Sequence, residues 1–162
     1  MLFRSFRKAD VGRPKALVAA EVLEEINPNL SVGVNIQPAR PQNIASLLDH
    51  HTLVIDGTDN YSTRVTVAEW TQGAGVSLVS ASVTGTEGQV LCLDDESRRY
   101  ADLFPEGPPP QQNCADVGVL ATSSMLMGQL AAHTAVQWIA AGERPKSLLV
   151  STWPLRIMRL GV

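Results

Sequence analysis

The segment 56–60 (DGTDN) places two acidic residues directly after a short apolar run. Magnesium prefers carboxylate and phosphate oxygens, so Asp56 and Asp59 could hold Mg²⁺ on the phosphates of a nucleotide. Arg64 follows about one helical turn later and could bind a phosphate through two hydrogen bonds. A structural role is the alternative, because Asp59 or Asn60 could simply cap the helix that follows.

Lys15 and Cys114 are further candidates for chemistry. Lys15 lies in the first turn of a predicted helix opened by Pro14. A lysine there can reach a phosphate held at the helix N-terminus, although most such lysines are only solvated. Cys114 precedes a long helical pattern, whose dipole favours the nucleophilic thiolate; a small buried packing residue is the alternative. Cys92 lies within a predicted strand, and we expect it to be a packing residue.

The elements that must position these residues alternate between helix and strand. Helices are predicted at 17–26, 41–50, 62–72 and 117–141, and strands at 30–36, 53–55, 77–83, 89–93, 147–151 and 155–160, with a proline-rich loop at 94–113. This alternation favours an α/β sheet with helices on its faces, and the later consecutive strands indicate an antiparallel or mixed extension. Ligands bind beyond the carboxyl ends of parallel strands in such sheets, which points to segment 56–60.

Composition and charge exclude several classes of protein. The 162 residues, 44% hydrophobic and 18% charged, are typical of one folded domain. A net charge of -3 offers no basic field for nucleic acid or an anionic membrane. No apolar run reaches the roughly 20 residues of a membrane span, and no apolar signal core follows the basic start, so we expect a cytoplasmic protein. Neither cysteine lies in a CxxC pair, so the sequence supports no cysteine-built zinc site.

Small residues recur every three or four positions along the predicted helix 117–141. They let another backbone approach closely, either the sheet beneath the helix or a partner subunit. The stripe consists of Ala121, Ser124, Gly128, Ala131 or Ala132, and Ala135.

Several segments in a fixed order carry a family resemblance. They are DVGRPKA at 10–16, Asn27-Pro28, DGTDN at 56–60 with Thr63-Arg64, 80–90 ending in EGQV, LFP at 103–105 and CADVGVL at 114–120. Across nearly all of the chain these segments resemble the ThiF/MoeB/HesA family of adenylyltransferases, which activate ubiquitin-like sulfur carriers. The resemblance implies one ThiF-type, ubiquitin-activating-like domain over residues 1–162, with a Rossmann-like parallel sheet and an antiparallel extension.

The resemblance also implies a reaction. Family members use ATP and Mg²⁺ to adenylylate the C-terminal glycine of a small ubiquitin-like sulfur carrier, which then serves thiamine or molybdopterin synthesis. Asp59 would hold Mg²⁺ and act in catalysis, and Cys114 falls on a cysteine implicated in covalent or sulfur-transfer chemistry. Family members are usually homodimers. The nucleotide-binding residues implied are Arg4, Lys15, Asp59, Asn60 and Arg64.

The sequence departs from the family pattern in two places. It contains no GxGxxG loop and no strand before Val11, so we expect an N-terminally truncated chain that lacks the first strand–helix–strand unit. The family's first zinc-binding CxxC would fall on Arg99 and Asp102, so we expect the zinc site to be lost. An adenylyltransferase with an incomplete chain is the leading hypothesis, and an inactive homologue acting as a carrier-binding or dimerisation module is the alternative. A nicotinamide dehydrogenase also needs the glycine loop and leaves segment 56–60 unexplained.

Overall fold

The computed structural model describes residues 6–104 and 118–161, and the chain divides into two compact units, Met1–Pro38 and Ala39–Val162. Arg4 and Cys114, both candidates from the sequence, lie outside the described residues. The expectations for these two residues therefore remain predictions.

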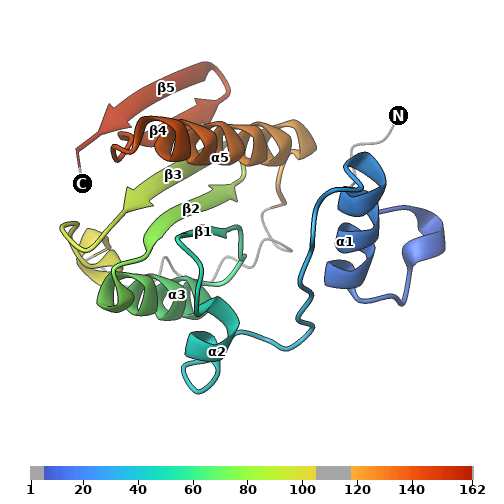
Figure 1. Cartoon of the computed structure of the whole chain (residues 1–162). Coiled ribbons are helices and arrows are strands. Elements are labelled where there is room, and N and C mark those ends of the chain that lie inside the picture. The colour runs from blue at the N-terminus through green and yellow to red at the C-terminus, as the bar shows by residue number, and fades with distance from the viewer. Residues whose placement is uncertain (1–5, 105–117, 162) are drawn as a thin grey trace. The chain divides into compact units, whose positions relative to one another are not determined.

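The first unit is built around one helix. A 3-10 helix, η1 (Lys8–Asp10), precedes helix α1 (Lys15–Ile26), which begins directly after Pro14 (Figure 1). Proline suits this position because its fixed φ fits the first turn and its missing N–H is not needed there. The helix ends before Asn27-Pro28, as predicted.

The predicted strand at 30–36 is wrong. These residues form no regular element, and no other described part of the first unit forms a strand. An alternating pattern becomes a strand only when a neighbouring backbone completes its hydrogen bonds. Local bonds hold this segment instead: the side-chain oxygen of Asn27 accepts from the Asn29 N–H, and that of Asn35 accepts from the Gln37 N–H.

The second unit contains a five-stranded sheet whose spatial order follows the sequence. Strands β1 and β2 are parallel, and every later pair is antiparallel, so the predicted parallel start with an antiparallel extension is confirmed. The strands are β1 (Leu53–Asp56), β2 (Ser77–Thr84), β3 (Glu87–Leu93), β4 (Ser147–Thr152) and β5 (Leu155–Leu160).

Helices cover both faces of this sheet (Figure 1). On one face lie α2 (Ile44–Leu48), α3 (Tyr61–Ala74) and the 3-10 helix η2 (Tyr100–Leu103). The hydrophobic core on this face consists of Ile44, Val54, Val67, Ala68, Leu78, Leu91, Leu93 and Tyr100. On the other face lies α5 (Ala121–Ala141). The hydrophobic core between this helix and the sheet consists of Val79, Val90, Cys92, Met127, Ala131, Ala135, Trp138 and Val150. The alternating side chains of β2 and β3 thus feed two separate cores.

Three predicted boundaries differ from the structure. The helix expected at 41–50 is confined to Ile44–Leu48, and the loop expected at 94–113 contains η2. The last helix begins at Ala121 and not at 117, because Val119 forms an isolated parallel bridge with Gly85 and the N-cap Leu120 is extended. None of the helices in the described ranges combines the length and apolar character that crossing a bilayer requires.

Candidate functional site

Asp56 ends β1 and points into the protein. The register of the parallel pair places it opposite Ser80 of β2, and the two side chains are 4% and 2% exposed. The Ser80 hydroxyl donates to Asp56 Oδ2 at 2.8 Å, and the Thr58 N–H donates to Asp56 Oδ1 at 2.9 Å. Both carboxyl oxygens are therefore engaged: Oδ1 holds the turn that follows the strand, and Oδ2 joins β1 to β2.

Asp59 and Asn60 have separate tasks. Asn60 is the N-cap of α3: its Oδ1 accepts from the Thr63 N–H at 2.8 Å and from the Ser62 hydroxyl at 3.0 Å. Asp59 is exposed and makes no hydrogen bond or ion pair with any residue in the described ranges. The capping role that the sequence left open thus belongs to Asn60, and the Asp59 carboxylate remains available for a ligand.

Arg64 lies in the first turn of α3, and its side chain reaches back to segment 56–60. Its Nε donates to the Thr58 carbonyl at 3.0 Å, and its Nη2 donates to the same oxygen. The Thr58 hydroxyl is buried and has no hydrogen-bond partner among the described residues. In this conformation Arg64 clamps the turn, whereas the sequence suggested only a phosphate ligand.

Tyr100 is the residue that sequence reasoning missed. It is 3% exposed and packs against Tyr61 and Phe104. Burial raises the pKa of the Tyr100 hydroxyl; the nearby Arg64 guanidinium opposes this rise, and the charge of Asp56 adds to it. The only signal in the sequence was the pair of aromatic residues, four positions apart, in a segment otherwise rich in charge.

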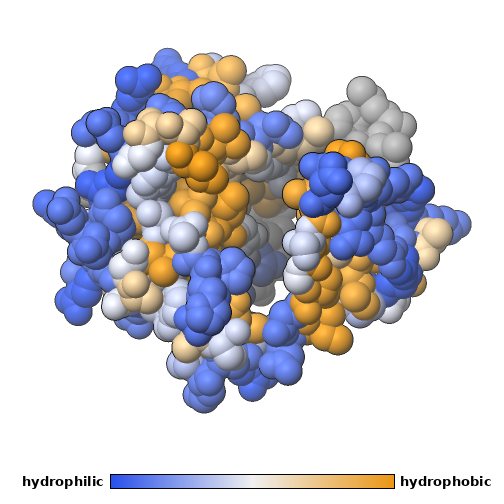
Figure 2. All heavy atoms as spheres, viewed as in Figure 1, coloured by the Kyte–Doolittle hydropathy of each residue, from blue (hydrophilic) through white to orange (hydrophobic). Residues whose placement is uncertain are grey.

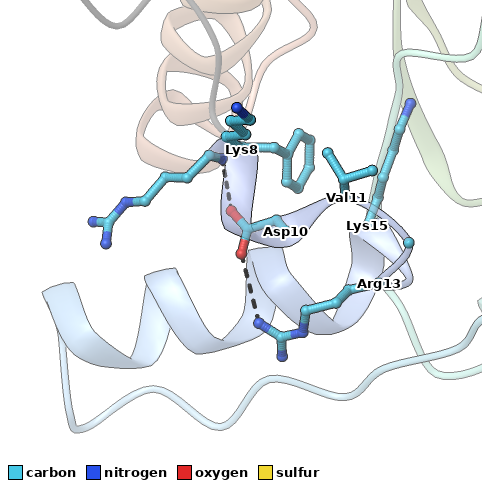
Figure 3. A pocket seen from close by; sticks show the side chains of 8 residues that line it. Lys8, Asp10, Val11, Arg13 and Lys15 are labelled. Atoms are coloured by element: carbon cyan, nitrogen blue, oxygen red, sulfur yellow. Dashed lines mark hydrogen bonds and ion pairs between the residues drawn. The ribbon is translucent and has the colours of Figure 1, made fainter.

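Lys15 belongs to a cationic hollow on the first unit (Figure 3). The hollow has a volume of about 690 Å³, and the residues that line it include Arg7, Lys8, Arg13 and Lys15. Asp10 accepts from the Arg7 N–H and pairs with Arg13, which also pairs with Glu21. Glu21, with a smaller contribution from Asp10, raises the pKa of Arg13. Lys15 extends away from the Asp10–Arg13 pair and forms no ion pair within the described part of the chain.

Cys92 is a packing residue, as predicted. Its side chain is 0% exposed, and its N–H donates to the Ser147 hydroxyl at 2.9 Å. Burial raises the pKa of the Cys92 thiol to about 11, against smaller opposing effects of Arg144 and Ser147. A thiol with such a pKa is a poor nucleophile at neutral pH.

The positions expected for the family's CxxC carry an ion pair. Arg99 Nε lies 3.1 Å from Asp102 Oδ2, and Arg99 Nη2 donates to Oδ1 of the same carboxylate. Among residues 6–104 and 118–161, no three His, Cys, Asp or Glu side chains are grouped so that they could hold a metal ion.

The small-residue stripe of α5 is divided between two surroundings. Ala131 and Ala135 are buried in the core beneath the helix, which supports close packing on the sheet. Ala121, Ser124 and Gly128 are exposed. The outward side of α5 also carries the exposed apolar residues Met125, Val136 and Ile139. Figure 2 shows apolar surface over this helix.

Comparison with known proteins agrees with this architecture. The adenylyltransferase and sulfurtransferase uba4 of Aspergillus terreus is 33% identical over 95% of this chain and 36% of its own length. The sulfur carrier protein adenylyltransferase of Thermus thermophilus is 33% identical over 84% of this chain and 53% of its own length. The sulfur carrier protein ThiS adenylyltransferase of Escherichia coli is 28% identical over 86% of this chain and 57% of its own length. The chain thus spans about a third to somewhat over half of these curated relatives.

Solved structures show the same fold at low sequence identity. Escherichia coli MccB with ATP aligns with a TM-score of 0.74 and 14% identity, over 96% of this chain and half (50%) of that one. PaaA aligns with a TM-score of 0.73 and 16% identity, over 98% and 50%. The ThiF family matches residues 4–159. The chain therefore belongs to the ThiF family.

Proposed function

We propose that this chain contributes to the ATP-dependent adenylylation of the C-terminal glycine of a ubiquitin-like sulfur-carrier protein. The observation that carries the proposal is the exposed Asp59 carboxylate, which lies in the hydrogen-bonded turn at the carboxyl end of β1. The curated relatives described above are named as sulfur-carrier adenylyltransferases or as adenylyltransferases and sulfurtransferases, which supports the same reaction.

The residues of the turn fit a magnesium ion held on nucleotide phosphates. Mg²⁺ is typically bound by one or two carboxylates together with substrate phosphates and water, so a single free carboxylate suffices. Asp59 would supply that ligand, whereas both oxygens of Asp56 are already engaged. When bound, the ion neutralises charge on the phosphates. Asn60 fixes the start of α3 beside Asp59 and so limits where the carboxylate can move.

The first unit supports the proposal through its cations. Lys15 has no anionic partner among the described residues, and Arg7 and Lys8 line the same hollow. Such a cluster suits a polyphosphate, whose developing charge a preorganised lysine stabilises. We assign Lys15, Arg4, Asn60 and Arg64 to nucleotide binding, and Cys114 to the subsequent sulfur transfer.

Carrier-dependent ATP–pyrophosphate exchange tests the proposal in the protein that carries this chain. Asp59→Asn keeps the size of the side chain and removes its charge, so we expect exchange to fall by roughly two orders of magnitude, as for loss of a preorganised electrostatic group. Asp95→Asn is the matched control, because Asp95 is also exposed and lies in a different turn. Unchanged exchange in Asp59→Asn removes Asp59 from the mechanism. Carrier binding without any exchange by the unaltered protein supports the inactive binding module instead.

A homodimer is part of the same proposal. The exposed apolar residues Met125, Val136 and Ile139 of α5 offer surface that a second copy could cover. Light scattering measures the mass directly, and a monomer at micromolar concentration contradicts this part of the proposal.

A further inference from the structure

Asp59 lies between two backbone positions that other side chains hold. On one side, the Thr58 N–H donates to Asp56 Oδ1 at 2.9 Å. On the other side, Asn60 Oδ1 accepts from the Thr63 N–H at 2.8 Å and so fixes the start of α3. The Asp59 side chain forms no hydrogen bond or ion pair within the described ranges. The backbone on either side of Asp59 therefore decides where its carboxylate can point.

The bond at Thr58 depends on how the Asp56 carboxylate is oriented. Rotation of this group would carry Oδ1 away from the Thr58 N–H, and the Ser80 hydroxyl opposes the rotation by donating to Oδ2 at 2.8 Å. Ser80 and Asp56 are 2% and 4% exposed, so water cannot easily replace the hydroxyl. The parallel register of β1 and β2 brings Ser80 opposite Asp56. The sheet thus acts on the turn through one buried carboxylate.

The stability of the sheet does not by itself explain an aspartate at this depth. Asp56 forms no ion pair with any residue in the described ranges, and its hydrogen-bond donors are the neutral Thr58 N–H and Ser80 hydroxyl. Burying a charge costs free energy unless it is both paired and hydrogen-bonded. Well-packed apolar residues in place of buried charged groups are often as stabilising or more so. The need for an acceptor at the Thr58 N–H explains the carboxylate better.

We propose that Ser80 and Asp56 are positioning residues for Asp59. The Ser80 hydroxyl fixes the Asp56 carboxylate, whose other oxygen holds the Thr58 N–H and so sets the backbone that presents Asp59. Partners of this kind, which orient a ligand without touching the ion, contribute to metal affinity in proteins. The effect on the Thr58 N–H stands independently, whereas the effect on turnover rests on the proposed function.

The first test observes the Thr58 N–H by NMR hydrogen exchange in the full chain. Asp56→Ala removes the acceptor, so this N–H should exchange with solvent roughly tenfold faster, as expected for loss of one hydrogen bond to a charged group. Ser80→Ala should accelerate the exchange by a smaller factor, because the carboxylate remains but can rotate. Asp56→Asn should restore slow exchange, since its oxygen can accept from Thr58 and its amide can donate to the Ser80 hydroxyl.

Two controls separate this local effect from unfolding. The Asn29 N–H, which donates to Asn27 Oδ1 at 3.1 Å in the first unit, should exchange equally in all variants. Ser82→Ala removes a hydroxyl from the same face of β2 and should leave the Thr58 exchange unchanged. Thr58 exchange that is equal in Ser80→Ala and Ser82→Ala overturns the proposal, and this comparison holds even if Asp56→Ala does not fold. A rise shared equally by all the amides of β2 reports opening of the sheet and also overturns it.

The second test concerns Mg²⁺ in a protein with carrier-dependent exchange. Ser80→Ala should raise the Mg²⁺ concentration needed for half-maximal rate by roughly tenfold, as for loss of a partner that orients a metal ligand. Ser82→Ala should leave this concentration unchanged, and Asp56→Asn should leave it close to that of the unaltered protein. A loss in Asp56→Asn as large as that in Asp59→Asn shows that Asp56 binds the ion itself, which overturns the positioning role.

A double substitution checks that Ser80 acts through Asp56. In an Asp56→Ala background, Ser80→Ala should not raise the required Mg²⁺ concentration further. An equal rise in both backgrounds shows that the two residues act separately and overturns the proposal. If no variant and no unaltered protein catalyses exchange, the proposed function fails, and the Thr58 N–H measurement still decides whether Ser80 and Asp56 hold the turn.

Discussion

Replacing Ser80 by alanine should destabilise the second unit by removing a donor to a buried carboxylate. The Ser80 hydroxyl lies 2.8 Å from Asp56 Oδ2, and the two residues are 2% and 4% exposed. Hydrogen bonds to charged groups contribute roughly 1.5–3 kcal/mol, and water cannot easily replace a donor at this depth. We therefore expect the free energy of unfolding to fall by about 2 kcal/mol, or a factor of roughly 30 in the folding equilibrium.

Urea unfolding followed by tryptophan fluorescence measures this loss. All three tryptophans, Trp70, Trp138 and Trp153, belong to the second unit, so their signal reports on the sheet. Ser82→Ala is the control, because Ser82 lies on the same face of β2 and forms no side-chain hydrogen bond with any described residue. In an Asp56→Asn background, Ser80→Ala should cost only about 1 kcal/mol, as for a neutral pair. A loss below about 0.5 kcal/mol, or one equal to that of Ser82→Ala, refutes the argument.

Two further predictions concern the core. A Cβ on Gly88 would lie 2.6 Å from Met127 Sδ and 3.0 Å from the Ser82 carbonyl oxygen, so Gly88→Ala should lower the free energy of unfolding in urea by about 1–3 kcal/mol. Gly128→Ala is the control, because a Cβ there meets open space and should not destabilise the protein. Equal effects of the two substitutions contradict the packing argument. The Cys92 pKa of about 11 lies above its ordinary value of 9.0, so the unfolded thiol ionises first and stability falls as pH rises from 9 to 11. Integrated between pH 9 and 11, this shift lowers the free energy of unfolding by about 2 kcal/mol, and Cys92→Ala should lack that part of the decline. Parallel pH dependences of the two chains contradict the assignment.

The fold class and the location of the candidate site follow from local patterns. The short apolar strand, the polar segment 56–60 and the amphipathic helix after it each depend on neighbouring residues, so their types were predictable from sequence. The N-cap could be narrowed only to Asp59 or Asn60, because both residue types cap helices. The structure decided for Asn60, whose Oδ1 is placed 2.8 Å from the Thr63 N–H.

The strand expected at 30–36 shows where local pattern stops being sufficient. Alternating apolar residues predict a strand, but its hydrogen bonds must come from another segment, and no described strand of the first unit provides them. The start of α5 was misplaced for a similar reason, because Val119 pairs with Gly85, far away in the sequence.

The sequence by itself determined the alternation of elements, the acidic turn after a buried strand and the packing role of Cys92. Only the tertiary structure decided that Asp56 is bonded inward to Ser80, that Asp59 remains free of hydrogen bonds within the described residues, and that Tyr100 packs against Tyr61 of α3. The physical reason is that secondary structure and capping depend on residues a few positions apart. The partner of a polar side chain depends instead on strand register and on which distant segments pack together, as β2 does opposite Asp56 and η2 does against α3.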